Sequence, residues 1–275
     1  MAVELQIQDG NPWWMSPDIW TVPGNDPEGA PGTPIVGQPT YLWARVTNTG
    51  RSSVTNATVR YYWANPSVGF DRNTANPIGT SNVNLAAGES AEVLCLTPWV
   101  PEYVNEGHEC VLAEAFHPSL DPLPATAAFD VPTDRHVAQR NLSVVLALQG
   151  FFSFSFVIYN TQRIERRFQI RAYQGEMGDL KPLQRTMGLE RLPENGKIAR
   201  IAFADERCPD EKAFEKATNE KMELSIPGKG SRFLTLIGRI EGEGALVHVE
   251  QVSENRQIGG LSVLVRGDQK ADKSD

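Results

Sequence analysis

The chain has 275 residues, a length that predicts two domains, each able to bury a core of its own. Lysine and arginine total 26 against 34 aspartates and glutamates, and this net charge of −8 argues against a nucleic acid or an anionic membrane surface as partner. No apolar run is long enough for a membrane-spanning helix, and Met1–Gly10 lacks the pattern of a secretory signal. We therefore expect no membrane insertion, and a cytoplasmic location or export without a cleavable secretory signal.

The charge is distributed unevenly along the chain. Residues 1–133 contain 14 acidic and 4 basic residues, whereas residues 135–275 contain 19 acidic and 22 basic ones. A change of composition this large predicts a domain boundary. We place a first domain at 1–133, a linker at 134–141, a second domain at 142–266 and a flexible polar tail at 267–275.

The first half of the chain predicts short strands separated by turns. Val59, Tyr61 and Trp63 alternate with Thr58, Arg60 and Tyr62, which is the period of a strand with one buried face. Turn residues such as Asn, Pro and Gly separate the apolar segments, and no helical periodicity interrupts them. This pattern favours an antiparallel β-sandwich of the immunoglobulin kind. The expected strands are 41–46, 57–63, 91–97 and 109–116.

The second half also predicts strands, together with one short helix. A helix is expected over 209–219, because a proline starts that segment and acidic residues occupy its first turn. Turn chemistry at 241–244 and at 253–256 predicts two hairpin loops. The expected strands are 142–148, 152–160, 168–173, 198–203, 232–240, 245–252 and 258–265.

The two halves share turn motifs, which predicts an internal repeat. Val46-Thr47-Asn48-Thr49 matches Ile158-Tyr159-Asn160-Thr161, and a glycine at 88 or 228 precedes a later strand in each half. The order V-x-N-T-G, aromatic strand, L-x-x-G-x-S resembles the bacterial CARDB-type immunoglobulin-like domains, which are related to fibronectin type III folds. The resemblance covers roughly residues 16–131 and is weaker over 142–265, where Gln162 replaces the glycine.

This resemblance implies an all-β protein made of two tandem immunoglobulin-like antiparallel β-sandwiches, the second diverged and carrying one short helix. It also implies a role in adhesion or surface binding. It supplies no catalytic residues. The motifs specify turns, so they indicate the fold more than the function.

No catalytic constellation is evident in the sequence. The four histidines, His108, His117, His136 and His248, lie in no recognisable catalytic motif, so we expect no catalytic residue and no cofactor. His108, Cys110 and His117 form the best zinc candidate, and a metal-dependent hydrolase using them is one alternative function. On a single strand, however, His117 would lie far along the chain and point away from the other two. Cys110 is then a core residue and no metal is bound.

Two further sets of residues leave alternatives open. Asp9, Asp18 and Asp26 lie among glycines and prolines, as calcium ligands do, but lack the spacing of a calcium-binding loop. Cys95 and Cys110 lie in strands that can face each other across the first sandwich, so a disulfide is possible. Without a secretory signal, reduced core thiols are the alternative that we favour.

The tryptophans are concentrated in the first half, and three lie near its start. Trp13 and Trp14 belong to a segment bracketed by prolines, and Trp20 follows closely. Exposed, these rings would anchor a protein partner or stack on a sugar, which makes a carbohydrate-binding module a second alternative function. Buried, they would close the end of the first sandwich.

One predicted hairpin turn of the second half contains three arginines, Arg163, Arg166 and Arg167. A basic turn and an acidic first domain would allow head-to-tail contacts between copies, and exposed strand edges would allow strand addition. We therefore interpret the chain as a non-catalytic bacterial structural or adhesion-type protein. Its expected partner is another protein or a second copy of itself.

Overall fold

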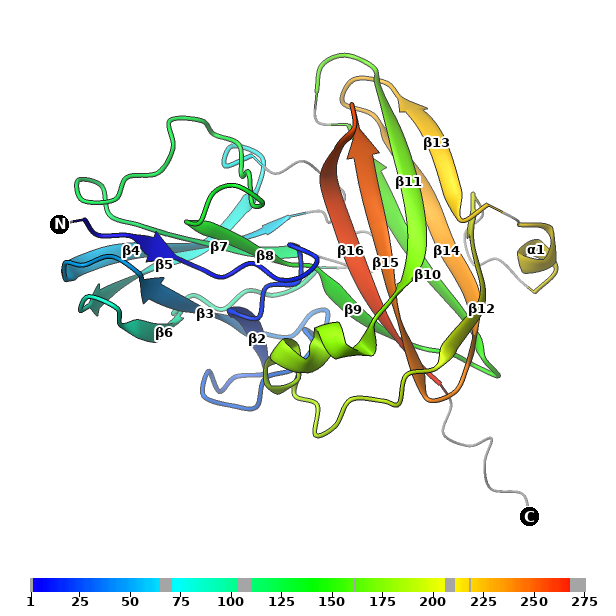
Figure 1. Cartoon of the computed structure of the whole chain (residues 1–275), viewed down its shortest axis with the longest axis horizontal. Helices are drawn as coiled ribbons and strands as arrows, with labels where there is room; N and C mark the ends of the chain where they lie inside the picture. The colour runs from blue at the N-terminus through cyan, green and yellow to red at the C-terminus, as the bar shows by residue number, and fades with distance from the viewer. Residues whose placement is uncertain are drawn as a thin grey trace. The chain divides into compact units, whose positions relative to one another are not determined.

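The structure, a computed structural model, describes residues 2–64, 71–102, 110–160, 162–205, 211–217 and 219–267. It divides into two compact units, each described here by itself (Figure 1). Unit 1 contains the described residues up to Asn141 together with a later segment, Pro182–Glu190. Unit 2 contains Leu142–Lys181 and the described residues from Arg191 onward.

Unit 1 is built from two four-stranded antiparallel sheets. In the first sheet, β3 pairs with β6 along one edge and with β1 and β2 along the other. The second sheet has the order β5-β4-β7-β8. The strands are β1 (Leu5–Gln6), β2 (Ile19–Pro23), β3 (Thr40–Asn48), β4 (Val54–Ala64), β5 (Asn76–Leu85), β6 (Ser90–Leu94), β7 (Cys110–Phe116) and β8 (Val137–Arg140).

The core of unit 1 lies between these two sheets. Alternate residues of β3 are buried along the strand, so Leu42 and Val46 meet Val59 and Tyr61 of β4 in one apolar cluster. The Tyr61 hydroxyl donates a hydrogen bond of 2.7 Å to the Val93 carbonyl oxygen and so links the two sheets. The period of two that the sequence shows over 57–63 is therefore the period of a strand in a sandwich.

Unit 2 is a second sandwich, with a three-stranded sheet β10-β14-β12 and a five-stranded sheet β13-β11-β15-β16-β9. Strand β9 joins its sheet parallel to β16, and the other named strand pairs of the unit are antiparallel. Phenylalanines of β10 pack against aliphatic residues of β14, β15 and β16 in the core. The strands are β9 (Leu142–Leu146), β10 (Phe151–Tyr159), β11 (Arg166–Gly175), β12 (Lys197–Ala204), β13 (Lys221–Ile226), β14 (Ser231–Glu241), β15 (Gly244–Ser253) and β16 (Arg256–Arg266).

The helical content is small. Helix α1 (Glu211–Lys216) confirms the helix predicted over 209–219, and Phe214 packs it against Ala202 and Ile237 of unit 2. Two 3₁₀ helices, η2 (Met177–Leu183) and η3 (Arg185–Met187), were not predicted. Across the described ranges, no helix has the length and apolar character needed to cross a bilayer. The prediction of an all-β sandwich fold with one short α-helix is confirmed.

Three local expectations need correction. The predicted linker, 134–141, contains β8, which pairs with β7 and completes a sheet of unit 1. Residues 162–167 and 241–244 were predicted as hairpin turns, but β10 and β11 lie in different sheets, as do β14 and β15. These turns carry the chain from one sheet to the other. Only the turn at 253–256, of the three predicted, closes a hairpin, in which Ser253 pairs with Arg256.

Candidate interaction surface

The tryptophans near the start of the chain are mostly buried in unit 1. Trp14 is fully buried and Trp20 is 4 % exposed, whereas Trp13 is half-buried. The Trp13 and Trp14 rings meet edge to face at 5.3 Å, and Trp13 packs against the core cluster that contains Leu112. A ring must present a free face to stack on a sugar, so Trp14 and Trp20 do not serve the predicted sugar platform, and of the three rings only Trp13 is partly accessible.

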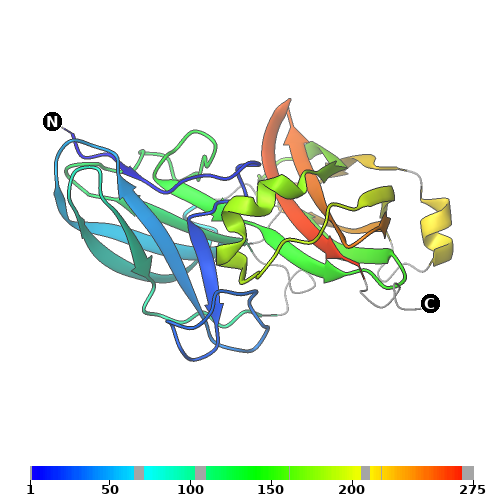
Figure 2. The ribbon, with the colours of Figure 1, turned by 60° about the horizontal axis from the view of Figure 1, so that its bottom comes forward.

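Part of the cover over Trp20 comes from the second half of the sequence. The strap, as we name Pro182–Glu190, belongs to unit 1 and runs beside β2, as Figure 2 shows. The Arg185 guanidinium lies 5.4 Å from the centre of the Trp20 ring, a cation–π contact. The Trp43 ring also stacks on Trp20, with 6.0 Å between the ring centres. Trp20 therefore serves packing inside the unit.

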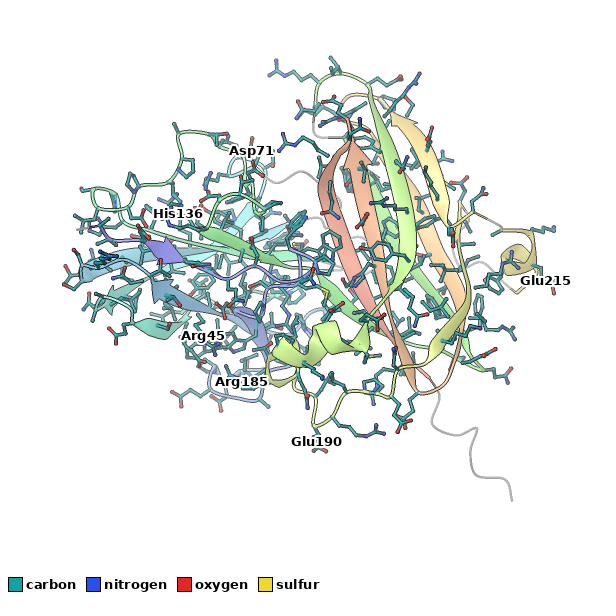
Figure 3. The ribbon with its side chains drawn as sticks, in the orientation of Figure 1. Arg45, Asp71, His136, Arg185, Glu190 and Glu215 are labelled. Atoms are coloured by element: carbon teal, nitrogen blue, oxygen red, sulfur yellow. The ribbon has the colours of Figure 1, made fainter. Side chains whose placement is uncertain are left out.

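Charged groups fasten the strap. Arg185 reaches Glu92 at 2.8 Å and Arg45 reaches the same carboxylate at 2.9 Å, from the positions labelled in Figure 3. Hydrogen bonds from both arginines, that from Arg45 foremost, lower the pKa of Glu92. Arg140 donates hydrogen bonds to the buried Thr186 hydroxyl at 2.6 Å and to the Ile19 carbonyl oxygen at 2.8 Å. The strap is thus an integral layer of unit 1.

The metal and disulfide candidates are not assembled into sites. Cys95 and Cys110 are free, buried thiols that belong to two different core clusters, so the possible disulfide is not formed. Burial raises the pKa of both thiols, which disfavours the thiolate that zinc binding requires. The His117 Nδ1 accepts hydrogen bonds from the backbone N–H groups of Ser119 and Leu120. His108, the third candidate, lies outside the described residues.

The three aspartates of the calcium alternative have other roles. Asp18 accepts a hydrogen bond from the Gln8 N–H and pairs with Arg45 at 3.4 Å. Asp26 is exposed and accepts a hydrogen bond from the Glu28 N–H at 3.0 Å within its own turn. Burial raises the pKa of Asp9 to about 7. Within the described ranges, no three histidine, cysteine, aspartate or glutamate side chains are placed to hold a metal ion.

A buried ionic cluster ties the start of the chain to β8 in unit 1. His136, labelled in Figure 3, lies 2.6 Å from Asp134 through Nδ1 and 3.2 Å from Asp121 through Nε2. Asp121 also accepts a hydrogen bond from the Leu5 N–H at 2.6 Å and pairs with Arg135 at 2.5 Å. Burial alone would lower the pKa of His136, but its two carboxylate partners outweigh burial and raise it. The cluster is structural, since each charge is paired within it.

The predicted basic turn lies at one end of unit 2 (Figure 1). We name Gln162–Glu165 the end loop; all four of its residues are exposed, and Ile164 at its tip is 75 % exposed. Arg163 and Arg167 are also exposed, whereas the half-buried Arg166 pairs with Glu254 at 3.6 Å. The loop therefore presents an exposed branched aliphatic side chain together with exposed charges, Arg163 and Glu165 on either side of it in sequence and Arg167 just beyond.

The end loop is held in one conformation by Asn160, which is 1 % exposed. Its amide nitrogen donates hydrogen bonds to the carbonyl oxygens of Ile164, Ile226 and Pro227 at 2.8, 2.9 and 3.2 Å. Its side-chain oxygen accepts a hydrogen bond from the Gln162 N–H at 3.0 Å. A loop anchored in this way is ordered before it meets a partner, which lowers the entropic cost of binding.

A shallow groove of about 390 Å³ lies beside the end loop. It opens where β11 and β15 separate, since β11 pairs with β15 only from Gln169 onward. Its lining alternates charged and polar side chains from three strands and one turn: Arg167, Gln169, Glu223, Ser225, Ser253, Glu254 and Asn255, together with Phe168, Leu224 and Val252. The sequence predicted only the arginines here, because strand pairing brings the remaining residues together from distant positions.

Comparison with known proteins gives few leads. No protein-family model and no curated protein matches the chain. The similar solved structures include red sea bream transglutaminase, with 10 % identity over 92 % of this chain and a TM-score of 0.25; the chain spans 32 % of that enzyme. They also include CBD12 from CALX1.2, with 12 % identity over 79 % of this chain and 76 % of that one, at a TM-score of 0.19.

A third match is the CupB6 tip adhesin from Pseudomonas aeruginosa, with 11 % identity over 98 % of both chains and a TM-score of 0.24. At such identities and TM-scores, none of these matches supports an argument about function. The candidate surface therefore rests on the geometry of unit 2 alone.

Proposed function

We propose that this chain is a non-catalytic structural or binding protein that uses the end loop of unit 2 to hold another protein. The observation that carries this proposal is the exposure of Ile164 on a loop that is fixed by Asn160 and is net basic, since Arg163, Arg166 and Arg167 outnumber Glu165. An apolar tip supplies contact area that loses water on binding, and the flanking guanidinium groups select carboxylates on the partner. The partner class that fits is a protein surface with apolar and acidic character.

The proposal extends to the finer class of the fold. We propose two tandem immunoglobulin-like domains of the CARDB type, the second diverged. Support comes from the turns after β3 and β10, where Asn48 and Asn160 make the same pattern of hydrogen bonds. Support for a non-catalytic role comes from the buried thiols of Cys95 and Cys110, whose raised pKa values make them poor nucleophiles.

The binding role is tested by capturing partners from a lysate of the source organism on the immobilised chain. Arg163→Glu reverses one charge of the end loop and should remove the specifically retained proteins. Lys197→Glu is the matched control, because Lys197 is also exposed in unit 2 but lies at the start of β12, remote in register from the end loop. Identical sets of retained proteins for the wild type and Arg163→Glu would contradict the proposal.

A further inference from the structure

Unit 1 exposes an apolar surface of its own. We name the exposed side chains of Ile35, Val36, Leu96 and Val100 the apolar patch; their exposed fractions are 49, 43, 75 and 48 %. They account for four of the nine large hydrophobic residues that are exposed within the described ranges. A soluble protein scatters such residues, so a concentration in two short segments indicates an interaction surface.

The two segments that carry the apolar patch run side by side. The Gly37 N–H donates a hydrogen bond of 2.9 Å to the Pro101 carbonyl oxygen, next to Val36 and Val100. Farther along, Thr40 and Trp99 exchange backbone hydrogen bonds of 2.7 and 2.8 Å. These bonds extend the pairing of β3 with β6 beyond the ends of the two strands, so the patch rests on a fixed backbone.

The two segments that carry the apolar patch contain charge of one sign. The segments 24–39 and 96–102 contain Asp26, Glu28 and Glu102 and no lysine or arginine. All three carboxylate residues are exposed. The end loop and the two residues after it carry Arg163, Arg166 and Arg167 against the single acid Glu165, so the charge beside Ile164 is net positive. Apolar and charged features on the two surfaces are therefore complementary in kind and in sign.

We infer that the end loop of one copy of this chain docks on the apolar patch of a second copy, so that chains associate head to tail. Ile164 packs among the exposed aliphatic side chains of the patch, and the loop arginines meet acidic residues of the segment that leads into it, Asp26 and Glu28. The contact is heterologous, because two different surfaces meet, and each copy keeps one free loop and one free patch. Association therefore continues into longer assemblies. This inference rests on the proposed function and names its partner.

Sedimentation velocity on the purified chain tests the inference with two variants. Ile164→Asp removes the loop surface and Leu96→Asp removes the patch surface; both positions are 75 % exposed, so neither change should disturb folding, which circular dichroism checks. The wild type should form species larger than a dimer as concentration rises, and salt should weaken them. Each variant alone should remain monomeric, with association weakened about tenfold or more.

Mixing the two variants is the decisive step. Ile164→Asp retains an intact patch and Leu96→Asp an intact loop, so an equimolar mixture should form a dimer and nothing larger. Leu148→Asp in unit 2 and Leu120→Asp in unit 1 are matched controls, at 70 and 53 % exposed, and should assemble as the wild type does. A mixture that stays monomeric, or variants that still assemble alone, would overturn the inference.

The outcome also separates this inference from the proposed function. A wild type that is monomeric at every concentration overturns head-to-tail association. If Arg163→Glu still abolishes capture of a different protein, the end loop binds that protein even though copies of the chain do not associate with each other. If capture is also unaffected, both proposals fail.

Discussion

Gln251 places an uncharged but strongly polar amide in the core of unit 2. The residue is 3 % exposed, and neither its amide nitrogen nor its amide oxygen has a hydrogen-bond partner within the described structure. A void of about 10 Å³ lies beside it, lined by Phe156, Ile158 and Ile170 among others. Burying an amide without partners costs free energy, because its hydrogen bonds to water are lost and not replaced.

Gln251→Met should therefore stabilise the protein. Methionine has a similar length, removes both unpaired polar groups and is flexible enough to fill the void. We expect the free energy of unfolding in urea to rise by about 1–2 kcal/mol. Gln162→Met is the matched control: Gln162 is exposed, so the same exchange there should change stability by less than about 0.5 kcal/mol. A loss of stability in Gln251→Met would show that the amide is satisfied in solution.

At the scale of elements, the turns after β3 and β10 show what a motif can predict. Asn48 and Asn160 are both buried and both anchor the turn that follows, as the matching sequences indicated. The replacement of the motif glycine, Gly50 in the first half, by Gln162 in the second half also has a cause. A side chain at Gly50 would approach the Ala2 carbonyl oxygen to 2.3 Å, so the first turn requires glycine, whereas Gln162 is exposed.

The alternation of Val59, Tyr61 and Trp63 with their polar neighbours predicted a strand, because successive side chains of a strand point to opposite faces of the sheet. Strand pairing could not be predicted in the same way. The turn at 241–244 has hairpin chemistry, yet β14 and β15 enter different sheets, because the local dihedral angles that reverse a chain also suit a crossing between sheets. The groove beside the end loop was missed for this reason, since its residues meet only through pairing.

The strap was unforeseen for a related reason: it is a segment of the second half that packs in unit 1. Its fit depends on Gly188, which has a positive φ of 67° and caps η3. A Cβ atom at this position would approach the Pro31 carbonyl oxygen to 2.1 Å. Any side chain here would therefore strain the backbone and push the strap away from β2.

Gly188→Ala should lift the strap and lower the free energy of unfolding by about 1–3 kcal/mol. Because Arg185 contacts the Trp20 ring, the tryptophan fluorescence should shift to longer wavelength, and trypsin should cleave at Arg185 sooner. Gly178→Ala, in η2 just before the strap, is the matched control: its Cβ would meet nothing within 4 Å, and its φ is not positive. Equal behaviour of the two variants would contradict the assigned role of the strap.

At the scale of the whole molecule, Asp9 and His136 of unit 1 respond to pH in the opposite direction from His248 of unit 2. In unit 1, burial foremost and the nearby Asp134 raise the pKa of Asp9 to about 7. The folded state thus favours the neutral acid, and stability is lost as pH rises from 3.8 to about 7. The raised pKa of His136, which faces Asp121, Asp134 and Arg135, acts in the same direction: its contribution is present below pH 6.5 and lost as pH rises.

Unit 2 has the reverse dependence through His248. This side chain is 2 % exposed, its Nδ1 lies 2.8 Å from the Ser262 hydroxyl, and its ring packs on Tyr173 at 5.3 Å. Burial lowers its pKa to about 4, although the negative charges of Asp179 and Glu250 oppose the shift. Below pH 6.5 His248 is therefore protonated in the unfolded chain but stays neutral in the folded chain, and stability is lost as pH falls from 6.5 to about 4.

These opposite dependences predict how two substitutions reshape the stability profile measured by urea unfolding between about pH 4 and pH 8. Asp9→Asn, neutral at every pH, should gain about 1–2 kcal/mol over the wild type at the alkaline end and little at the acidic end. His248→Gln loses packing at all pH values, but its deficit should narrow by about 1–2 kcal/mol towards acidic pH. The exposed Glu4→Gln is the control and should follow the wild type throughout. Profiles for Asp9→Asn and His248→Gln that run parallel to the wild type would refute the assignment of pH sensitivity to these two groups.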